Sequence, residues 1–356
     1  MERFKVMKHI GVLSCNIHCN FTNYGSALQS WALTRVIDKM GAGKYESVLI
    51  DYCPPSHIAY DPLNPMKNMW DKDEQSRREC ELSLPAIREN FDKFDKFYHS
   101  QFRLTGKSYT KADYCNIRDN ERLDAFVCGS DTIFCIDEFK GFDDAYFANY
   151  GCMRGQAISY GASFGDSKFD EKTYPILLSK LQNFKSVGLR ENNEIAYLKS
   201  NLEVPCVHNI DPTLLLKGED YSPIVADRLI GEDYILLYSR RFNPQMFLYA
   251  DELAKELHCK VVNISLRPSY NTNHIMKYSA GVEEFLSLVK NARHVITNSY
   301  HGLIFSHQFK RQYSIFTREQ AGNKIKALQS LLETSGIDDL RNSSLQYLEN
   351  SLKLIV

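Results

Sequence analysis

Residues 292–306, ARHVITNSYHGLIFS, decide the predicted fold. Within them, His294–Thr297 has the length and β-branched content of a buried strand, and helical apolar spacing resumes after Gly302. A strand followed at once by a helix is half of a βαβ unit. Ligands of open α/β sheets bind at the carboxyl ends of such strands, where the next helix offers unpaired N–H groups. Ser299 and His301 are therefore candidate ligand-binding residues; alternatively, Ser299 caps the helix and His301 packs in the turn.

The same succession of strand and short polar turn recurs along the chain. The predicted strands are 8–14, 47–52, 125–128, 156–159, 186–190, 204–210, 234–238, 260–264, 294–297 and 312–316. The predicted helices are 27–40, 244–257, 283–290, 324–335 and 345–354, the first with Leu28, Trp31, Ala32, Arg35 and Val36 on its inner face. Alternation of this kind predicts an α/β fold with parallel sheets.

A polar, turn-rich stretch at 218–231 divides the pattern into two halves. We predict two Rossmann-like domains facing one another across a cleft, residues 1–222 and residues 223–356, with the last helix packing back on the first domain. Residues 54–110 are proline-rich at their start and form an insertion with one or two helices, interpreted as a lid or an acceptor-facing flap. Ordinary packing of a helix on the core explains the aromatic residues Phe91, Phe94 and Phe97.

Bulk composition excludes several classes of function. The formal net charge is −1 over 356 residues, so general binding to nucleic acid has no electrostatic basis and any anion site must be local. Ten scattered cysteines favour free thiols over a disulfide framework. Cys15, His18 and Cys19 are the nearest approach to a zinc site, but no second ligand pair follows, so no metal is expected. No window approaches the roughly 20 apolar residues of a membrane span, so we expect a cytoplasmic protein.

Charged residues gather at the predicted strand ends. Arg, His and Asp side chains without metal-ligand spacing suit a small anion handled by general acid–base chemistry. These residues are Asp131, Arg190, Asp211, Arg240, Arg241, Arg267 and His301. Each has a structural alternative: Arg190 with Glu191 as an ion pair at a helix start, Asp131 as a helix cap, Asp211 as a turn cap.

Several motifs, taken in order, resemble the polysaccharide pyruvyl transferase family. They are NYGSALQSWAL (23–33), FVCGSD (126–131), ISYGASFG (158–165), SVGLRE (186–191), DPTLLL (211–216), GVEEFLSLVKNARHVITNSYHG (281–302) and NKIKALQSLLETSGI (323–337). The resemblance implies a GT-B-like fold and a bacterial enzyme of capsule or exopolysaccharide biosynthesis. Such an enzyme transfers the enolpyruvyl group of phosphoenolpyruvate to two sugar hydroxyls, giving a pyruvate ketal and phosphate, without a cofactor.

The resemblance also implies roles for individual residues. His301 becomes the general acid or phosphate ligand, Arg190 the clamp on carboxylate or phosphate, and Asp131 the residue that orients or deprotonates the acceptor. The donor, bound mainly by the C-terminal domain, would contact Ser163, Gly165, Arg190, Ser299, His301 and Gly302. The acceptor, bound by the N-terminal domain, would contact Asn23, Tyr24, Gly25, Ser130 and Asp131. That acceptor is expected to be a lipid-linked sugar at the inner membrane face, which implies peripheral membrane contact.

One motif departs from the family. Many members carry arginine where this chain has Ser299, so Arg240, Arg241 or Lys324 is expected to supply the missing charge, or else the anion differs. Two other hypotheses stay open: a GT-B-type glycosyltransferase that uses a nucleotide sugar, and a non-catalytic relative that binds a glycan or an anion.

Overall fold

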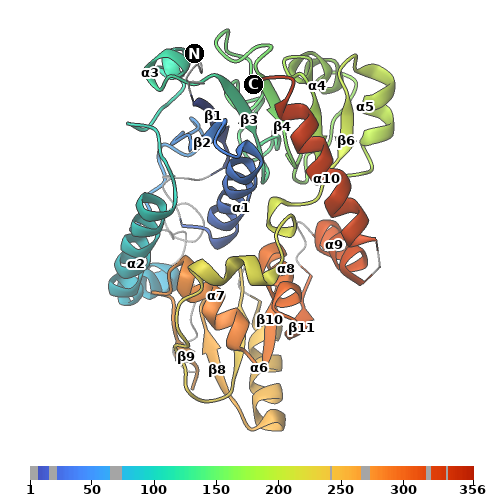
Figure 1. The fold of residues 1–356 in the computed structure, drawn as a ribbon. Coiled ribbons are helices and arrows are strands. Elements are labelled where there is room, and N and C mark those ends of the chain that lie inside the picture. Colours follow the sequence, from blue (N-terminus) through green and yellow to red (C-terminus); the bar gives the residue numbers. More distant parts are fainter. Residues whose placement is uncertain are drawn as a thin grey trace.

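A parallel sheet forms the centre of the N-terminal half of this computed structural model (Figure 1). The structure describes residues 7–15, 22–64, 74–240, 243–265, 273–317, 322–333 and 336–356. The strand order is β2-β1-β3-β4, and isolated bridges from Ala162 to Asp131 and Leu189 continue the sheet toward the pair β5-β6. The strands are β1 (Lys8–Leu13), β2 (Tyr45–Leu49), β3 (Ala125–Cys128), β4 (Ala157–Ser159), β5 (Val187–Leu189) and β6 (Cys206–His208).

A second parallel sheet, in the order β11-β10-β7-β8-β9, forms the C-terminal half. Val295, on the strand next to the centre of this sheet, pairs with Leu236 on one side and Tyr313 on the other. Its neighbour YILLY is buried throughout, as expected for a parallel strand covered on both faces. The strands are β7 (Tyr234–Tyr238), β8 (Lys260–Asn263), β9 (Ile275–Met276), β10 (His294–Thr297) and β11 (Gln312–Ile315).

Helices cover both sheets. Among the predicted elements, the bounds of β10 and of the helix 244–257 are confirmed. The helices are α1 (Tyr24–Gly41), α2 (Glu74–Gln101), α3 (Ile117–Asn120), α4 (Thr173–Leu181), α5 (Ile195–Asn201), α6 (Pro244–Leu257), α7 (Val282–Asn291), α8 (Tyr300–Gln308), α9 (Gly322–Glu333) and α10 (Ile337–Leu352). Short 3-10 turns lie at Tyr114–Asn116, Pro212–Leu214 and Gly218–Ile224.

Helix α1 lies where the two halves meet. It begins three residues before its predicted start, because the Asn23 side chain accepts hydrogen bonds from the N–H groups of Gly25 and Ser26 and caps it. The prediction that Arg35 lies on the inner face is wrong: Arg35 is exposed and bonds Gln101. One hydrophobic core joins α1 to the C-terminal sheet and α8, so the halves are packed together rather than tethered.

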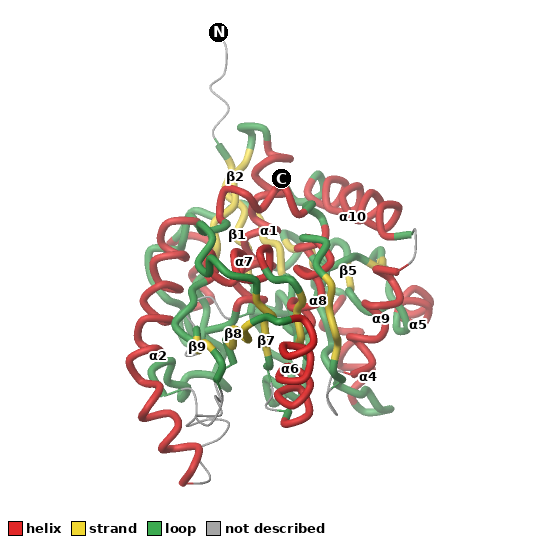
Figure 2. The backbone as a smooth tube through the Cα atoms, turned by 90° about the horizontal axis from the view of Figure 1, so that it is seen from below, coloured by secondary structure: helices red, strands yellow, loops and turns green. Residues whose placement is uncertain are grey.

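The insertion contributes α2, which runs along one side of the molecule (Figure 2) and contacts α7 of the C-terminal half. Lys93 forms an ion pair of 2.7 Å with Glu284, and Asn90 Nδ2 donates to the Ala280 carbonyl at 2.6 Å. Phe94 and Phe97 are buried in the shared core, which confirms packing as their role; Phe91 is half-buried. The helix therefore bridges the two halves.

The last helix, α10, returns to the N-terminal sheet. Tyr347 Oη donates to the Ser159 carbonyl at 2.9 Å, and Ser351 Oγ lies 2.8 Å from Ser186 Oγ. Ser344 Oγ accepts from the Ile210 N–H at 3.1 Å. The chain thus crosses between the two halves twice.

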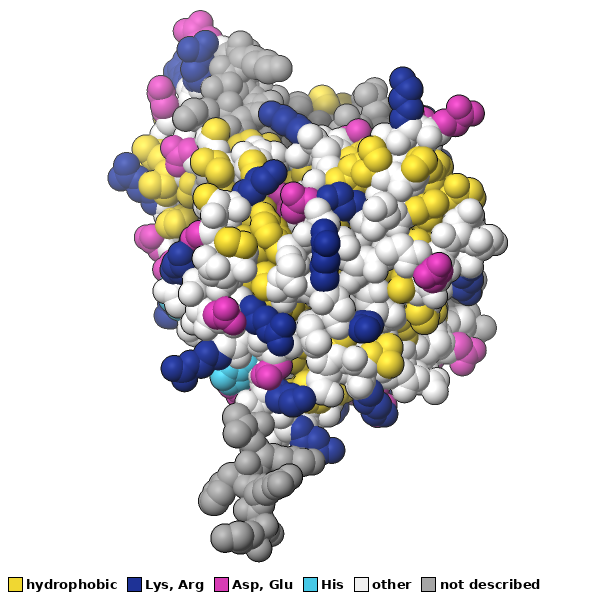
Figure 3. Space-filling model, turned by 90° about the horizontal axis from the view of Figure 1, so that it is seen from above, with side chains coloured by type: hydrophobic (Ala, Val, Ile, Leu, Met, Phe, Trp, Pro, Cys, Tyr) yellow, Lys and Arg dark blue, Asp and Glu magenta, His cyan; other side chains and the backbone are white. Residues whose placement is uncertain are grey.

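Charges on the outer end of the N-terminal half are mixed. Figure 3 shows Lys and Arg side chains interspersed with Asp, Glu and apolar ones on this face. Of the helices in the described part of the chain, none has the length and apolarity needed to cross a bilayer.

Candidate functional site

The turn between β10 and α8 is held rigidly. Ser299 Oγ accepts from the Gly302 N–H at 3.2 Å and caps α8. Thr297 Oγ1 accepts from the Ser299 N–H at 3.0 Å and donates to the Tyr238 carbonyl at 2.7 Å. A Cβ on Gly302 would lie 2.4 Å from Thr297 Oγ1, so only glycine fits there. Both Ser299 and Gly302 therefore position the turn and the side chains that follow it.

His301, in the first turn of α8, inserts its ring between two parts of the N-terminal half. A Cβ added to Gly25 at the start of α1 would lie 2.1 Å from His301 Nδ1, so the ring rests on the glycine. On its other side, Nε2 lies 3.5 Å from Asp211 Oδ2. The residue is 8% exposed. Close contact with Gly25 thus explains a glycine at this place in α1.

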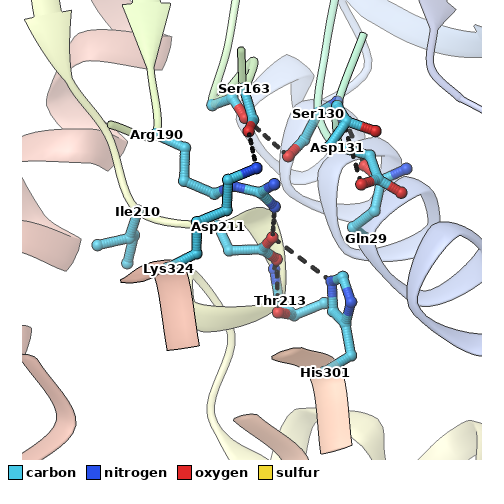
Figure 4. Close-up of polar contacts among 12 residues, drawn as sticks. Gln29, Ser130, Asp131, Ser163, Arg190, Ile210, Asp211, Thr213, His301 and Lys324 are labelled. Atoms are coloured by element: carbon cyan, nitrogen blue, oxygen red, sulfur yellow. Dashed lines mark hydrogen bonds and ion pairs between the residues drawn. The ribbon is translucent and has the colours of Figure 1, made fainter. Parts of the chain in front are cut away.

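Asp211 connects His301 to Arg190 (Figure 4). Its Oδ2 lies 2.8 Å from Arg190 Nη1, while Oδ1 accepts from the Thr213 N–H at 3.0 Å and from Thr213 Oγ1 at 2.6 Å. Burial by itself raises the pKa of Asp211, but His301, Arg190 and Thr213 outweigh it and hold that pKa well below its usual range. The turn-capping role anticipated for Asp211 is real, and the same carboxylate also contacts both candidate catalytic residues.

Arg190 follows β5 and stacks on the first residue of α8. Its Cζ lies 4.8 Å from the centre of the Tyr300 ring, a cation–π arrangement. Glu191 does not pair with Arg190 at a helix start. Its carboxylate instead accepts from Ser163 Oγ and from the Phe164 N–H. Asp211 accepts from Nη1 of Arg190, and a guanidinium carries five N–H groups, so Arg190 keeps further N–H donors for a ligand.

Lys324, from α9, reaches the same cluster. Its Nζ lies 3.4 Å from Ser163 Oγ, which also accepts from the Gly165 N–H at 3.1 Å. Burial and the neighbouring Arg190 lower the pKa of Lys324, against the attraction of Glu191. Gly165 has a φ of 69°, and a Cβ there would strike Cys135 Sγ at 2.5 Å. Lys324 of the C-terminal half therefore lies beside Ser163 Oγ and close enough to Arg190 of the N-terminal half to feel its charge.

Asp131 lies beside a second carboxylate that the sequence did not indicate. Asp131 Oδ2 accepts from Ser26 Oγ at 2.7 Å and Oδ1 from the Thr132 N–H at 2.9 Å. Thr132 Oγ1 donates to Glu138 Oε2 at 2.6 Å. Removal from water raises the pKa of Glu138, the Thr132 hydroxyl lowers it, and Asp131 raises it further. Glu138 nevertheless keeps 36% of its side chain exposed, so it remains accessible.

Other predicted site residues have structural partners. Tyr24 lies in the shared core, where its ring stacks on Phe285 and its hydroxyl donates to the Ala280 carbonyl at 2.6 Å. Asn23 is the cap of α1. Ser130 is buried, with its N–H donated to Gln29 Oε1 and its hydroxyl to the Gly161 carbonyl.

Of the three predicted arginines Arg240, Arg241 and Arg267, the structure describes the first. The backbone of Arg240 donates to Asn298 Oδ1, and its side chain is half-buried. Arg241 and Arg267 lie outside the described residues, as do His18 and Cys19 of the zinc alternative. The described part of the chain contains no group of His, Cys, Asp and Glu suited to a metal ion.

Comparison with solved structures defines the class of fold. A Listeria monocytogenes protein assigned as a UDP-N-acetylglucosamine 2-epimerase aligns with a TM-score of 0.51 at 10% identity, over 98% of this chain and 96% of that one. The Neisseria meningitidis UDP-GlcNAc 2-epimerase gives 0.46 at 11% identity, over 98% and 94% of the two chains. A Rickettsia africae glycosyltransferase gives 0.44 at 11%, over 98% and 96%. The two parallel sheets and the alignment with the Listeria monocytogenes protein give an α/β fold with two Rossmann-like domains, of the GT-B-like class.

The family follows from the sequence match. The profile of the polysaccharide pyruvyl transferase family matches residues 23–312, most of the chain. The protein therefore belongs to that family, which implies a transferase acting on a sugar acceptor. No curated protein sequence matches the chain significantly.

Proposed function

We propose that the protein transfers the enolpyruvyl group of phosphoenolpyruvate to two hydroxyls of a sugar, forming a pyruvate ketal and inorganic phosphate. The observation that carries the proposal is the convergence of Arg190 and His301, from different domains, on Asp211 Oδ2 at 2.8 and 3.5 Å. A cation and a titratable imidazole at one point suit a compact anionic substrate that must also be protonated. Family membership supports the same reaction.

In the proposed first step, His301 gives a proton to the methylene carbon of phosphoenolpyruvate. The carbon becomes a methyl group, and positive charge develops at the phosphate-bearing carbon, where one sugar hydroxyl attacks. Arg190 and Lys324 hold the carboxylate and phosphate by charge-assisted hydrogen bonds, each worth roughly 1.5–3 kcal/mol. Lys324 thereby supplies the positive charge that the family carries at the position of Ser299.

In the proposed second step, another hydroxyl of the same sugar attacks this carbon and phosphate leaves with its bonding electrons. Each hydroxyl loses its proton, and Asp131 and Glu138 are the carboxylates positioned to accept them. Burial raises the pKa of Glu138, which makes it a better proton acceptor than an ordinary glutamate. The donor contacts are thus proposed to come from both domains, not from the C-terminal domain alone.

A ligand screen by thermal shift tests this function against its main alternative. We expect phosphoenolpyruvate to raise the melting temperature and UDP- or GDP-sugars to leave it unchanged, because ligand binding to the native state stabilises it. The Arg190→Ala variant should lose the response to phosphoenolpyruvate. Stabilisation by a nucleotide sugar alone would reject the proposal in favour of a glycosyltransferase. No response to either donor, with binding of a glycan, would indicate a non-catalytic relative.

A further inference from the structure

The two ring nitrogens of His301 have different surroundings. Nε2 is fully buried, and among the described residues it has no hydrogen-bond partner of good geometry; Asp211 Oδ2 lies 3.5 Å away. Nδ1 faces the start of α1, where the absence of a side chain on Gly25 leaves room for the ring. One nitrogen is therefore directed at a fixed anion (Figure 4), and the other lies against the start of α1.

The orientation of the Asp211 carboxylate is fixed by its other contacts. Thr213 donates twice to Oδ1, which leaves Oδ2 for Arg190 and His301. Neutral imidazole carries its hydrogen on one nitrogen only, and the neighbour of each nitrogen decides which. A hydrogen on Nε2 points positive charge at Oδ2. A lone pair on Nε2 would instead face a carboxylate across a buried gap, which is unfavourable in a low-dielectric interior.

Resting on the proposed function, we propose that Asp211 is a positioning residue that keeps hydrogen on His301 Nε2 and makes Nδ1 the atom that delivers the proton to the substrate. In this step the Nδ1–H bond breaks as a C–H bond forms at the methylene carbon from the substrate's double-bond electrons. The imidazolium becomes neutral imidazole with hydrogen retained on Nε2. Asp211 stays ionised throughout, and Arg190 balances its charge.

Other charged and titratable groups lie near this pair. Tyr300 precedes His301 on α8, Arg190 follows β5, and Asp131 and Glu191 act on both Arg190 and Tyr300 from the N-terminal domain. Only Asp211 lies within ion-pair distance of the ring among the described residues. Changing Asp211 is therefore the direct way to test the assignment.

The first test needs no substrate. Nitrogen NMR of the full chain labelled at histidine, with His301→Gln to assign its signals, reports which ring nitrogen carries hydrogen when His301 is neutral. We expect hydrogen on Nε2 in the wild type and in Thr213→Val, which keeps the Asp211 charge. In Asp211→Asn, the preference of the hydrogen for Nε2 should weaken. Hydrogen on Nδ1 in the wild type would overturn the assignment, even if Asp211→Asn does not fold.

The second test is kinetic. The general acid must be protonated, so phosphate release should decline as pH rises. In Asp211→Asn that decline should move to lower pH, because the carboxylate charge 3.5 Å from Nε2 is gone. A purely structural role would lower the melting temperature without moving the profile, and that result would reject the proposal. Should the wild type release no phosphate from phosphoenolpyruvate, the proposed function fails, whereas the NMR result still decides the hydrogen position.

Discussion

The carboxyl ends of the two parallel sheets are put to different uses. Three charged residues follow strands of the N-terminal sheet. Arg190 and Asp211 form an ion pair, and Asp211 also lies near His301. Asp131 accepts a hydrogen bond from Ser26 of α1. In the C-terminal sheet the corresponding polar residues bind backbone: Ser265 Oγ accepts from the Ser239 N–H, and Asn298 Oδ1 from the Arg240 N–H. Two parallel sheets of different strand order thus yield one edge with charges available for chemistry and one edge whose amides and hydroxyls hold loops.

His301 is the exception on the C-terminal side. It follows β10 but reaches across to Gly25 and Asp211 of the other domain. The difference between the two edges therefore predicts that catalysis depends on N-terminal charges, on Lys324 of α9 and on this one inserted ring, while changes elsewhere on the C-terminal edge affect stability.

The largest effect is expected for His301→Ala. Loss of a general acid should reduce phosphate release by about 10²–10⁴-fold. Phosphate release from phosphoenolpyruvate with an acceptor measures it. His307→Ala, six residues further along the same helix and half-buried, is the matched control and should remain near wild type. Equal losses in both variants would contradict a special role for the inserted ring.

The pH dependence of stability should distinguish the two halves next. Burial, together with the charge of Lys140, lowers the pKa of His57 to about 4, although the Glu138 carboxylate lies 3.9 Å away. Because the folded pKa lies below the unfolded value of 6.5, this contribution to stability is complete above pH 6.5. It is lost as pH falls toward 4, about 3 kcal/mol in all. When the free energy of unfolding is measured with denaturant at several pH values, His57→Gln should not show this loss of stability.

His294→Gln provides the comparison from the C-terminal sheet. His294 is half-buried on β10, and burial lowers its pKa as well. We expect it to change the pH dependence less than His57→Gln, since His57 is fully buried. The reverse order would show that the pH response belongs to the C-terminal domain.

Gly25→Ala should separate the geometry of the site from the stability of α1. The new methyl group would lie 2.1 Å from His301 Nδ1 and must displace the ring. Misplacement of a catalytic group by about 1 Å costs on the order of 10²-fold in rate, whereas alanine favours the helix itself. Gly151→Ala, where a methyl group meets nothing within 4 Å, is the control. Unchanged turnover in Gly25→Ala would mean that the ring need not rest on α1.

Asn298→Ala tests the C-terminal edge directly. Asn298 is buried, accepts from the Arg240 N–H at 2.8 Å and donates to Ser239 Oγ at 3.3 Å. The Asn298→Ala change removes the acceptor of the Arg240 N–H, and an unsatisfied donor should lower the free energy of unfolding by about 1–3 kcal/mol. Calorimetry should find little change in the affinity for phosphoenolpyruvate. A large loss of affinity with normal stability would place ligand contacts on this edge.

The smallest change is expected for Glu138→Gln on the acceptor side. If Glu138 shares proton transfer with Asp131, turnover should fall about 10-fold, less than the 10²–10⁴-fold of a sole general base. Affinity for phosphoenolpyruvate should persist. Asp137→Asn, an exposed neighbour in sequence, is the control. Loss of donor affinity in Glu138→Gln would move Glu138 to the donor side of the site.

Local pattern was sufficient for most elements. The apolar run of β10 and the amphipathic helix α6 have their predicted bounds, because periodicity and capping act over a few residues. Local pattern was insufficient for the start of α1, where Asn23, expected from the family resemblance to contact the acceptor, caps the helix. The side chain of Tyr24 was likewise assigned to the acceptor, although α7 and the Ala280 carbonyl bury it in the core.

The sequence by itself determined the alternation of strands and helices, and with it the strand ends where His301, Arg190 and Asp131 stand. Only the tertiary structure decided that Asp211 joins Arg190 to His301 and that Glu138 lies beside Asp131. The physical reason is the distance along the chain over which the deciding contacts act. Strand and helix patterns depend on neighbours in the chain, whereas Asp211 and His301 meet only because two separately patterned domains pack on a common core.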